Sequence, residues 1–236
     1  MCVDNASGRI GRRGSRLRPI RVSRGTRPRI VGLTATDGCL FTGFRKINFK
    51  SGDRELVETY LRVLGRGNPV KSARTRTGGV VYFTEFGDAR LYRWLLTIGL
   101  MPAKSLVLGG IDVPDAHLAP LLRGLLEGDG SIVNFVHHPT VKVDPDYEYE
   151  RLYAVFNSAS RAHVEWIQQR ARALFGVSGS IYKHRPVARK HDFFRLAYGK
   201  HDSVVLLRAI YPDAGVPKLE RKWRIWNEYA RRQELK

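Results

Sequence analysis

The feature that most constrains this chain is a short motif that occurs twice. Residues 30–38 read IVGLTATDG and residues 122–130 read LRGLLEGDG, so both follow the pattern apolar-x-Gly-Leu-x-x-small-Asp-Gly. Each copy places one carboxylate, Asp37 or Asp129, in the same local setting. A chain that duplicates a carboxylate in this way favours a single site assembled from two related halves.

Shorter matches extend the repeat beyond the motifs. They pair FKS at 49–51 with FNS at 156–158, FG at 86–87 with YG at 198–199, and MPAK at 101–104 with LERK at 219–222. The spacing between matching segments only grows along the chain, as expected for a diverged duplication with an insertion. The polar, Pro-containing stretch 136–150 fits that insertion as a long hairpin loop. We therefore predict two homologous halves, residues 29–112 and 113–236.

Composition limits the class of protein. A chain of 236 residues with 43% hydrophobic residues can form one sizeable domain or two small ones. It has no apolar run long enough to cross a bilayer and no secretory signal. Cys2 and Cys39 are too few and too badly spaced for a disulfide framework or a thiolate zinc site. We expect a non-secreted protein in a reducing cytosol, or in an organellar matrix if an organelle encodes it.

The net charge of +19 predicts a polyanionic partner, because cationic side chains displace counterions from a phosphate backbone. Nine arginines lie between Arg9 and Arg29, and no acid occurs from Asn5 to Thr36. Arginine interleaved with Gly, Ser and Pro cannot form a core, so residues 1–28 are predicted to be a flexible basic arm. The arm is either a solvated or targeting tail or a nucleic-acid contact, and both interpretations stay open.

The predicted element order is αββαββα, twice over. Each half has a motif helix that stops at Asp-Gly, a hairpin (40–44 with 45–50; 131–136 with 152–158), an amphipathic helix (53–64; 161–175), a second hairpin (70–86; 180–198) and a closing helix (88–98; 202–210). A tail helix is expected at 219–231. This order indicates an α+β fold with antiparallel sheets and helices on one face. In strand 45–50, Ile47 and Phe49 would face the helices, leaving a polar face that can read base edges.

Together these features resemble the LAGLIDADG homing endonuclease family, in its single-chain, two-repeat form. The resemblance covers residues 29–236 and includes both motifs, their spacing, the element order and the lysine-containing segments that close each half. It implies tandem repeats that form antiparallel sheet saddles, with the two motif helices packed at the central interface. It also implies a monomeric enzyme that cuts both strands of a duplex DNA target and leaves short 3′ overhangs.

The resemblance further implies a site at the ends of the motif helices. Asp37 and Asp129 would converge there, and because like charges repel and raise a pKa, a divalent cation such as Mg²⁺ or Mn²⁺ would resolve the conflict. The backbone carbonyls of Thr36 and Gly128 would also face the metal. Lys104 and Lys222 match the basic residues that the family places around the catalytic water, although each could instead be an ordinary surface or phosphate-contacting lysine.

The first motif departs from the family by having Ala35 in place of an acidic residue. In the second motif Glu127 lies beside Asp129, and the register with Asp37 selects Asp129 as the metal-binding acid. We interpret the histidines as loop or surface residues and the four tryptophans as core. The candidates for the DNA-facing side of the sheets are Lys46, Asn48, Lys50, Lys71, Asn157, Tyr182, His184 and Arg195. A one-residue shift in register would exchange the two faces.

The leading hypothesis is a site-specific, metal-dependent DNA endonuclease encoded by a mobile intron or similar insertion. One alternative is a maturase that binds its intron RNA without cutting. Another is a DNA-binding regulator that keeps the fold but not the metal site, against which the retention of both aspartates argues. A third, a basic structural protein of a ribonucleoprotein, does not suit the duplicated acids.

Overall fold

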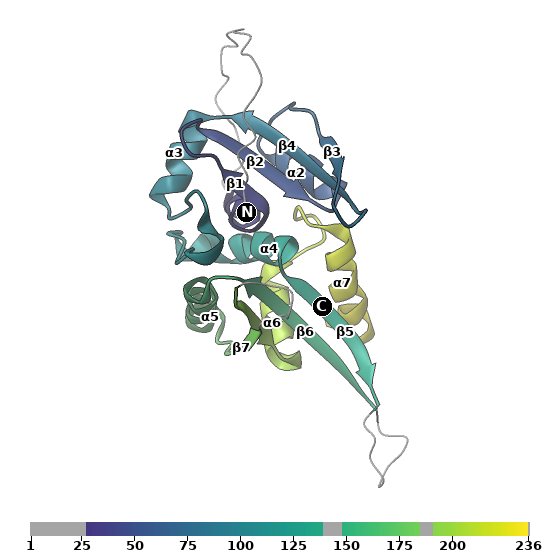
Figure 1. Ribbon diagram of the computed structural model, residues 1–236. Helices are drawn as coiled ribbons and strands as arrows, with labels where there is room; N and C mark the ends of the chain where they lie inside the picture. Colours follow the sequence, from purple (N-terminus) through teal and green to yellow (C-terminus); the bar gives the residue numbers. More distant parts are fainter. Residues whose placement is uncertain (1–26, 139–147, 185–190, 236) are drawn as a thin grey trace.

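The computed structural model describes residues 27–138, 148–184 and 191–235, which form two halves with the same order of elements (Figure 1). The first half contains α1 (Arg27–Asp37), β1 (Gly38–Leu40), β2 (Lys46–Ser51), α2 (Arg54–Val63), β3 (Lys71–Arg74), β4 (Val80–Gly87) and α3 (Ala89–Thr97). The second contains α4 (Leu118–Gly128), β5 (Ser131–His137), β6 (Tyr149–Ser158), α5 (Arg161–Phe175), β7 (Ser180–His184), β8 (Phe193–Tyr198) and α6 (Lys200–Ile210), followed by α7 (Glu220–Arg232). Two short 3₁₀ helices, Lys104–Leu106 and Asp115–His117, lie between the halves. The predicted αββαββα order is confirmed.

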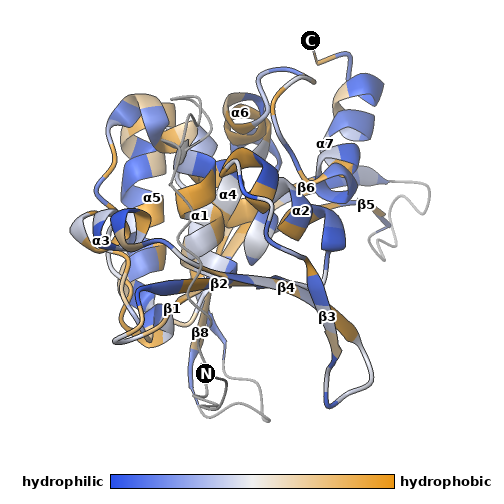
Figure 2. Ribbon diagram, turned by 90° about the horizontal axis from the view of Figure 1, so that it is seen from above, coloured by the Kyte–Doolittle hydropathy of each residue, from blue (hydrophilic) through white to orange (hydrophobic). Residues whose placement is uncertain are grey.

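Each half has one four-stranded antiparallel sheet. The strand orders are equivalent, β1-β2-β4-β3 in the first half and β5-β6-β8-β7 in the second. Figure 2 shows the helices gathered on one side of the first sheet, with the other side open. The predicted α+β class, with antiparallel sheets and helices on one face, is therefore confirmed.

The strand alternation separates a buried face from an open one. In β2, Ile47 and Phe49 are fully buried, whereas Lys46 and Lys50 are exposed. The Phe49 ring stacks on Tyr60 of α2 with ring centroids 4.1 Å apart, so the buried face of the sheet packs directly on that helix. The alternation predicted for this strand is confirmed.

The two motif helices, α1 and α4, pack against each other through glycine. A Cβ atom added to Gly32 would clash with the carbonyl oxygen of Leu121, and one added to Gly124 would clash with that of Arg29. No side chain fits between the backbones at these two positions. The small residues of each motif are thus required by the close approach of the helices at the centre of the molecule.

Several expectations about local structure were wrong. Helix α1 begins at Arg27, inside the expected arm, and the side chain of Arg29, the last of the nine arginines, is fully buried rather than free to contact nucleic acid. Strand β1 ends at Leu40 rather than continuing to residue 44, because the chain turns there, with Gly43 at φ +82° and Arg45 at φ +48°.

Four side chains also differ from expectation. Helix α5 has the predicted bounds, but Leu174, which helical spacing predicts on the same apolar face as Val164, Ile167 and Ala171, is 41% exposed. Trp94 is 40% exposed, although it was expected in the core, whereas His163, expected on the surface, is buried. Cys39 is disulfide-bonded, a bond that the sequence did not predict; Cys2 lies outside the described residues.

The remaining boundaries follow the sequence closely. The insertion predicted at 136–150 lies largely outside the described residues, but β5 and β6 extend into it from both sides. Within the described part of the chain, no helix combines the length and the apolar character that crossing a membrane requires.

Candidate active site

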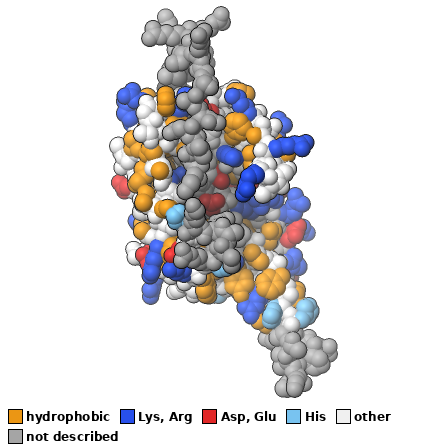
Figure 3. Space-filling model, viewed as in Figure 1, with side chains coloured by type: hydrophobic (Ala, Val, Ile, Leu, Met, Phe, Trp, Pro, Cys, Tyr) orange, Lys and Arg blue, Asp and Glu red, His pale blue; other side chains and the backbone are white. Residues whose placement is uncertain are grey.

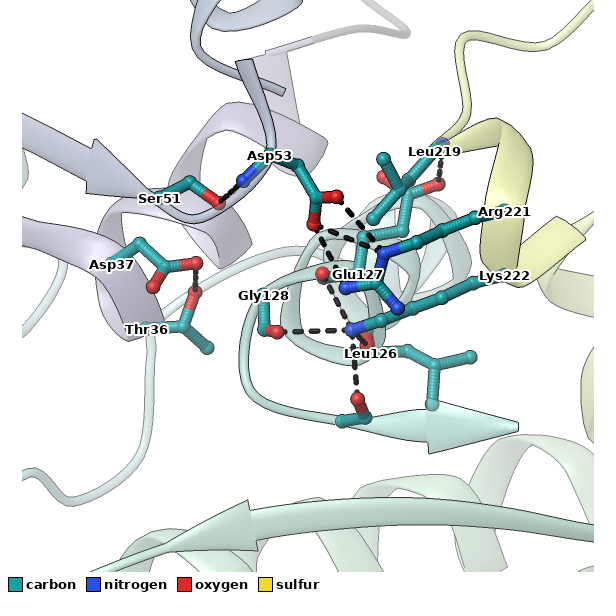
Figure 4. Close-up of polar contacts among 11 residues, drawn as sticks. Thr36, Asp37, Ser51, Asp53, Leu126, Glu127, Gly128, Leu219, Arg221 and Lys222 are labelled. Atoms are coloured by element: carbon teal, nitrogen blue, oxygen red, sulfur yellow. Dashed lines mark hydrogen bonds and ion pairs between the residues drawn. The ribbon is translucent and has the colours of Figure 1, made fainter. Parts of the chain in front are cut away.

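The two motif aspartates lie at neighbouring helix ends. Asp37 is the last residue of α1, and Asp129 directly follows the last residue of α4. A Cβ atom added to Gly128 would lie 2.9 Å from Oδ2 of Asp37, so the two helix ends are in contact (Figure 4). The structure thus brings the equivalent ends of both motifs to one place.

Burial and the charge of Asp129 together raise the pKa of Asp37 from 3.8 to about 7. The ammonium groups of Lys222 and Lys104 act in the opposite direction, as does the neighbouring hydroxyl of Thr36. In the absence of a metal ion, Asp37 therefore keeps its proton to a much higher pH than an ordinary aspartate does. This is the behaviour expected of two carboxylates forced together without enough positive charge.

Lys104 and Lys222 hold the same position in the two halves. Nζ of Lys104 donates to the carbonyl oxygen of Gly38, and Nζ of Lys222 donates to that of Gly130 at 2.7 Å. These glycines are the residues that directly follow Asp37 and Asp129. Both lysines are buried, and burial lowers the pKa of each to about 8. The alternative that they are ordinary surface lysines is wrong.

Lys222 makes a larger set of contacts than Lys104. Its ammonium also donates to the carbonyl oxygens of Leu126 at 2.9 Å, Glu127 at 2.7 Å and Gly128 at 3.0 Å (Figure 4). These are terminal carbonyls of α4, which lack partners within the helix and carry its negative dipole end. The Gly128 carbonyl, predicted as a metal ligand, therefore already accepts a hydrogen bond from Lys222.

Glu127, the acid two residues before Asp129, points away from the site. Its Oε2 accepts from Nε of Arg29 at 2.7 Å, and its Oε1 accepts from the backbone N–H of Leu219 at 2.9 Å. Burial raises the pKa of Glu127, and Arg29 opposes that shift. Glu127 is thus half of a buried ion pair that joins the two halves. Sequence reasoning missed this pair, and its one signal was Ala35 standing where the second motif has Glu127.

A second ion pair between the halves was also missed. The guanidinium of Arg221 in α7 binds the carboxylate of Asp53, directly before α2, through Nη2–Oδ2 at 2.8 Å and Nε–Oδ1 at 3.0 Å (Figure 4). Arg221 precedes Lys222 in the chain, so α7 both caps α4 and reaches across to the first half. This contact holds the second half's lysine in place beside the motif ends.

The two aspartates suit a divalent cation that is shared with a phosphate. Within the described residues, no group of three or more His, Cys, Asp and Glu side chains could hold a metal ion by itself. Mg²⁺, however, takes oxygen ligands and commonly completes its coordination with water and substrate phosphate around one or two carboxylates. Because Asp37 is poorly compensated, the site fits such an ion, and Asp37 and Asp129 are the residues that would hold it.

Each aspartate also opens onto a cavity beside its own sheet. A groove of about 1460 Å³ is lined by Asp37, Lys104 and the β2 residues Asn48 and Lys50. A smaller cavity of about 290 Å³ is lined by Asp129 together with residues of β6 and α5. Figure 3, which looks onto the open faces of the sheets, shows acidic side chains near the middle of the molecule with Lys and Arg side chains around them. Asp37 and Asp129 thus each line a cavity, and neither residue is fully buried.

The strand register places all eight predicted DNA-facing residues on the open faces of the sheets. In the first half, Lys71 is opposite Phe83, which is also opposite Lys50, so these side chains share the face of Lys46 and Asn48. In the second half, Arg195 is opposite both Asn157 and Tyr182, and His184 is opposite Phe193. Contact of these residues with DNA remains a prediction.

Two of these eight side chains have partners within the protein. Lys46 pairs with Glu85 at 2.9 Å, and both side chains are largely exposed. Asn157 donates to the backbone carbonyl of Asp129 at 2.8 Å, which ties β6 to the end of the second motif. Asn157 therefore supports the position of Asp129 in the protein without DNA.

Comparison with known proteins yields likeness in structure alone. The sequence matches no known family and no curated protein. Among solved structures, full-length DUF199/WhiA from Thermatoga maritima has a TM-score of 0.52 at 18% identity over 89% of this chain, which spans 63% of the length of that one. The homing endonuclease I-DmoI with DNA and Ca has a TM-score of 0.53 at 13% identity, over 86% of this chain and 97% of that one. The meganuclease I-SmaMI, bound to uncleavable DNA, has a TM-score of 0.55 at 11% identity, over 86% and 90%.

These similarities establish the fold. The chain has the two-repeat LAGLIDADG fold, with two four-stranded antiparallel sheets and paired motif helices. The same fold occurs in homing endonucleases and in WhiA, and at 11–18% identity the likeness shows the fold alone.

Proposed function

We propose that this protein is a metal-dependent endonuclease that hydrolyses one phosphodiester in each strand of a specific duplex DNA site. The observation that carries the proposal is the meeting of Asp37 and Asp129 at the ends of α1 and α4, where burial and mutual repulsion raise the pKa of Asp37 to about 7. A divalent cation bound between two such carboxylates would neutralise their mutual repulsion. Without a bound cation, the repulsion destabilises the folded protein, so the pair is better explained by a function than by folding alone.

The residues at the motif ends would have different roles in hydrolysis. Asp37 and Asp129 would hold Mg²⁺ or Mn²⁺, which when bound supplies a lowered pKa for an attacking water and stabilises the departing oxygen. Lys104 and Lys222 keep a positive charge next to the acids, where it stabilises negative charge that develops on a scissile phosphate. The backbone carbonyl of Thr36 is the remaining proposed ligand, beside that of Gly128.

The open sheet faces would bind the DNA. The groove of the first half and the faces of both sheets carry Lys, Arg and Asn side chains, and the chain has a net charge of +19. A monomer with two unlike halves suits an asymmetric target. By resemblance to its structural neighbours, which include homing endonucleases, we propose that the protein leaves short 3′ overhangs and is encoded by a mobile intron or similar insertion.

One observation favours a second candidate, a DNA-binding regulator that does not cut. The ammonium of Lys222 already occupies the Gly128 carbonyl, and the charges of Lys222 and Lys104 partly compensate Asp37 without any metal. Aspartates neutralised by these lysines could have a structural role in a protein that binds DNA but does not bind a metal ion. The same binding face could also hold intron RNA in a maturase.

The test separates binding from cleavage. Binding sites are selected from a random duplex library in Ca²⁺, and the selected duplexes are then incubated with Mg²⁺, Mn²⁺ or EDTA. The wild-type protein should cut both strands in Mg²⁺ or Mn²⁺ only. Asp37→Asn and Asp129→Asn should each lower the double-strand cleavage rate at least about 100-fold, because an oxygen ligand is kept but its charge is lost. Affinity for the duplex should survive.

The matched control is Asp115→Asn, an exposed acid that pairs with Arg170. It removes the same charge from the protein away from the motif ends and should cut at the wild-type rate. Cleavage by the double Asn variant at the wild-type rate would contradict the metal role. Tight, selective binding without cleavage in either metal would favour the regulator, and preference for structured RNA over duplex DNA would favour the maturase.

A further inference from the structure

The hairpin formed by β5 and β6 extends beyond its sheet as a two-stranded ribbon. Strand β6 pairs with β8 only from Ala154 to Ser158, whereas its outer part, from Tyr149 to Tyr153, pairs with β5 alone. Figure 1 shows this ribbon projecting from the second half of the molecule. Its five outer residue pairs span roughly 17 Å. A two-stranded ribbon is one of the elements that the major groove of B-DNA admits.

The two faces of the ribbon have different surroundings. On one face, Asn134 and Glu150 bind the guanidinium of Arg232 in α7, at 2.7 and 2.6 Å. The C-terminal helix therefore packs against that face at Asn134 and Glu150. The opposite face is continuous with the open side of the sheet, and it carries what we call the aromatic ladder: Val133, Phe135, His137, Tyr149, Arg151 and Tyr153.

Contacts between its rings hold the aromatic ladder in a defined arrangement. The ring of Phe135 lies 6.4 Å from that of Tyr153 with 24° between their planes, and the ring of His137 lies 5.0 Å from that of Tyr149. Phe135 remains 43% exposed. The ladder is thus an ordered, largely aromatic surface on a projecting element, and its other side chains are partly exposed.

Arg151 fixes the polar atoms of the ladder. Its guanidinium lies over the Tyr149 ring, 4.5 Å from the centroid, and donates to the hydroxyls of both Tyr149 and Tyr153, the latter at 2.6 Å. The tyrosine hydroxyls accept these bonds and are drawn toward the cation. Both tyrosine hydroxyls are thus engaged by Arg151, and the rest of the ladder consists of ring and aliphatic groups.

This chemistry selects one feature of duplex DNA. Among the base edges in the major groove, only thymine offers a methyl group, and apolar side chains such as Phe contact it. The first half carries Lys46, Asn48 and Lys50 on its open face, which suit hydrogen-bond acceptors and phosphates, beside Val81 and Phe83 of β4. The ladder also lies on the same face as Asn157, Arg195 and Tyr182, which continues the proposed DNA surface outward.

We propose that the aromatic ladder reads thymine methyl groups in the outer part of the half-site bound by the second half of the protein. The ribbon's length covers about five base pairs at 3.4 Å each. The inference rests on the proposed DNA binding, and not on cleavage. The outer part of the second half-site would thus be read by apolar contacts from a ribbon of seven residue pairs, whereas the equivalent β1 and β2 of the first half pair over three residues only.

The experiment changes the DNA as well as the protein: it removes thymine methyl groups from the target site. Sites are selected from a random duplex library with the full chain, and thymines in the outer part of each half-site are replaced by deoxyuridine, which lacks only the C5 methyl. Each replacement in the second half-site should weaken binding about fourfold, the equivalent of about 0.8 kcal/mol for one buried methyl group. The same replacement in the first half-site should have no effect.

The protein variants are chosen as neighbours on opposite faces of one strand. Phe135→Ala should lose the thymine preference and become insensitive to deoxyuridine in the second half-site. Val136→Ala is the matched control, because Val136 is 46% exposed on the other face of the ribbon and should leave the preference intact.

The outcomes distinguish this inference from the proposed function. If no duplex is selected, or only RNA is retained, the proposed DNA binding fails and this inference falls with it. If sites are selected but deoxyuridine has no effect in the second half-site, only the aromatic ladder's role is overturned. A Phe135→Ala variant that weakens binding equally for all sequences would also overturn it.

Discussion

The ends of the two motif helices share their chemistry but differ in how firmly the protein supports them. Each end has an aspartate, a following glycine and a buried lysine that donates to that glycine's carbonyl. In the first half Lys104 makes only this hydrogen bond among the described residues, whereas Lys222 in the second half spans four carbonyls. The pattern retained in both halves is acid, glycine and lysine. The surrounding support has diverged.

The open sheet faces differ more than the motif ends do. The first half carries lysines and Asn48, and the second carries a projecting ribbon with aromatic side chains. On the proposed function this contrast has a simple cause. The two DNA strands present the same phosphodiester chemistry to the two motif ends, but an asymmetric target presents different bases to the two sheets. The halves are therefore free to diverge in recognition and constrained to agree at the acids.

The interface between the halves also breaks the symmetry. Arg29 and Glu127 form a buried ion pair, while the equivalent positions in the other half are Leu121 and Ala35. The pair thus occurs on one side of the pseudo-two-fold axis and is replaced by small and apolar residues on the other. Replacing Arg29 and Glu127 by their counterparts, Leu and Ala, therefore tests whether the fold needs this ion pair.

The largest expected effect on stability comes from breaking this pair. Arg29→Leu places the equivalent residue of the other half at position 29 and leaves the Glu127 carboxylate buried without its cation. The free energy of unfolding should fall by about 3–5 kcal/mol, as measured by chemical denaturation.

The double variant Arg29→Leu/Glu127→Ala removes both charges and makes the two sides of the axis alike. It should lose less than the sum of the two single variants, because no uncompensated charge remains. Arg54→Ala, which breaks an exposed pair with Glu58 in α2, is the control and should cost less than about 1 kcal/mol. Strict additivity of the two single variants would show that the pair is not coupled.

The second prediction concerns the pH dependence of the motif ends without metal. The pKa of Asp37 in the folded protein is about 7, above its ordinary value of 3.8, so the folded state binds this proton more tightly than the unfolded state. Its contribution to stability is full below about pH 4 and is lost as the pH rises through 7. The total change is on the order of 4 kcal/mol. Asp37→Asn should therefore be more stable than the wild type at pH 8 in EDTA, and no more stable at pH 4.

Adding Mg²⁺ gives a second test of the difference between the wild type and Asp37→Asn. Mg²⁺ should raise the Tm of the wild type at pH 8 more than at pH 5.5, because the ion competes with the proton on Asp37. It should leave the Tm of Asp37→Asn almost unchanged. A constant difference in stability between the two proteins across this pH range would contradict the raised pKa.

The third prediction compares the two lysines. Lys104→Met and Lys222→Met each replace a buried ammonium with a neutral side chain of similar length. Because Lys222 bonds to four carbonyls and Lys104 to one, Lys222→Met should be the less stable by about 1–2 kcal/mol. Chemical denaturation at pH 7 measures the difference. Equal losses would show that the extra carbonyls near Lys222 do not depend on it.

The parts of this structure that the sequence predicted well depend on local patterns. The spacing of apolar residues gave both bounds of α5, Arg161–Phe175, because a helix places residues three and four apart on one face. Alternation in β2 separated Ile47 and Phe49 from Lys46 and Lys50, because a strand has a period of two. Because the two halves have matching segments, the order of elements predicted for one half could also be predicted for the other.

The parts that failed depend on partners distant in the sequence. Arg29 ends the run of nine arginines from which the basic arm was predicted, but its partner Glu127 lies in the other motif. The capping role of Lys222 was likewise hidden, since nothing near it in the sequence indicates four carbonyls of α4. The face of β6 that carries Tyr149, Arg151 and Tyr153 lies partly in the predicted insertion loop, where no strand was expected. In each case the missing information is a long-range contact.

The smallest expected effect separates the two sheet faces by their response to salt. Lys50→Ala in the first half removes a cation that would neutralise a phosphate or contact a base, so the slope of log affinity against log salt should fall by about one. Phe135→Ala in the second half removes no charge and should leave that slope unchanged while relaxing the preference for particular bases. Both side chains are exposed, so neither variant should alter the Tm by more than a few degrees. Affinity for a selected duplex between 50 and 200 mM salt measures the slope.

Lys200→Ala, which removes the same charge from the start of α6 rather than from a sheet, is the matched control and should keep the wild-type slope. If Lys200→Ala lowers the slope as much as Lys50→Ala, the effect is one of net charge, and the open face of the first sheet is not where the phosphates lie.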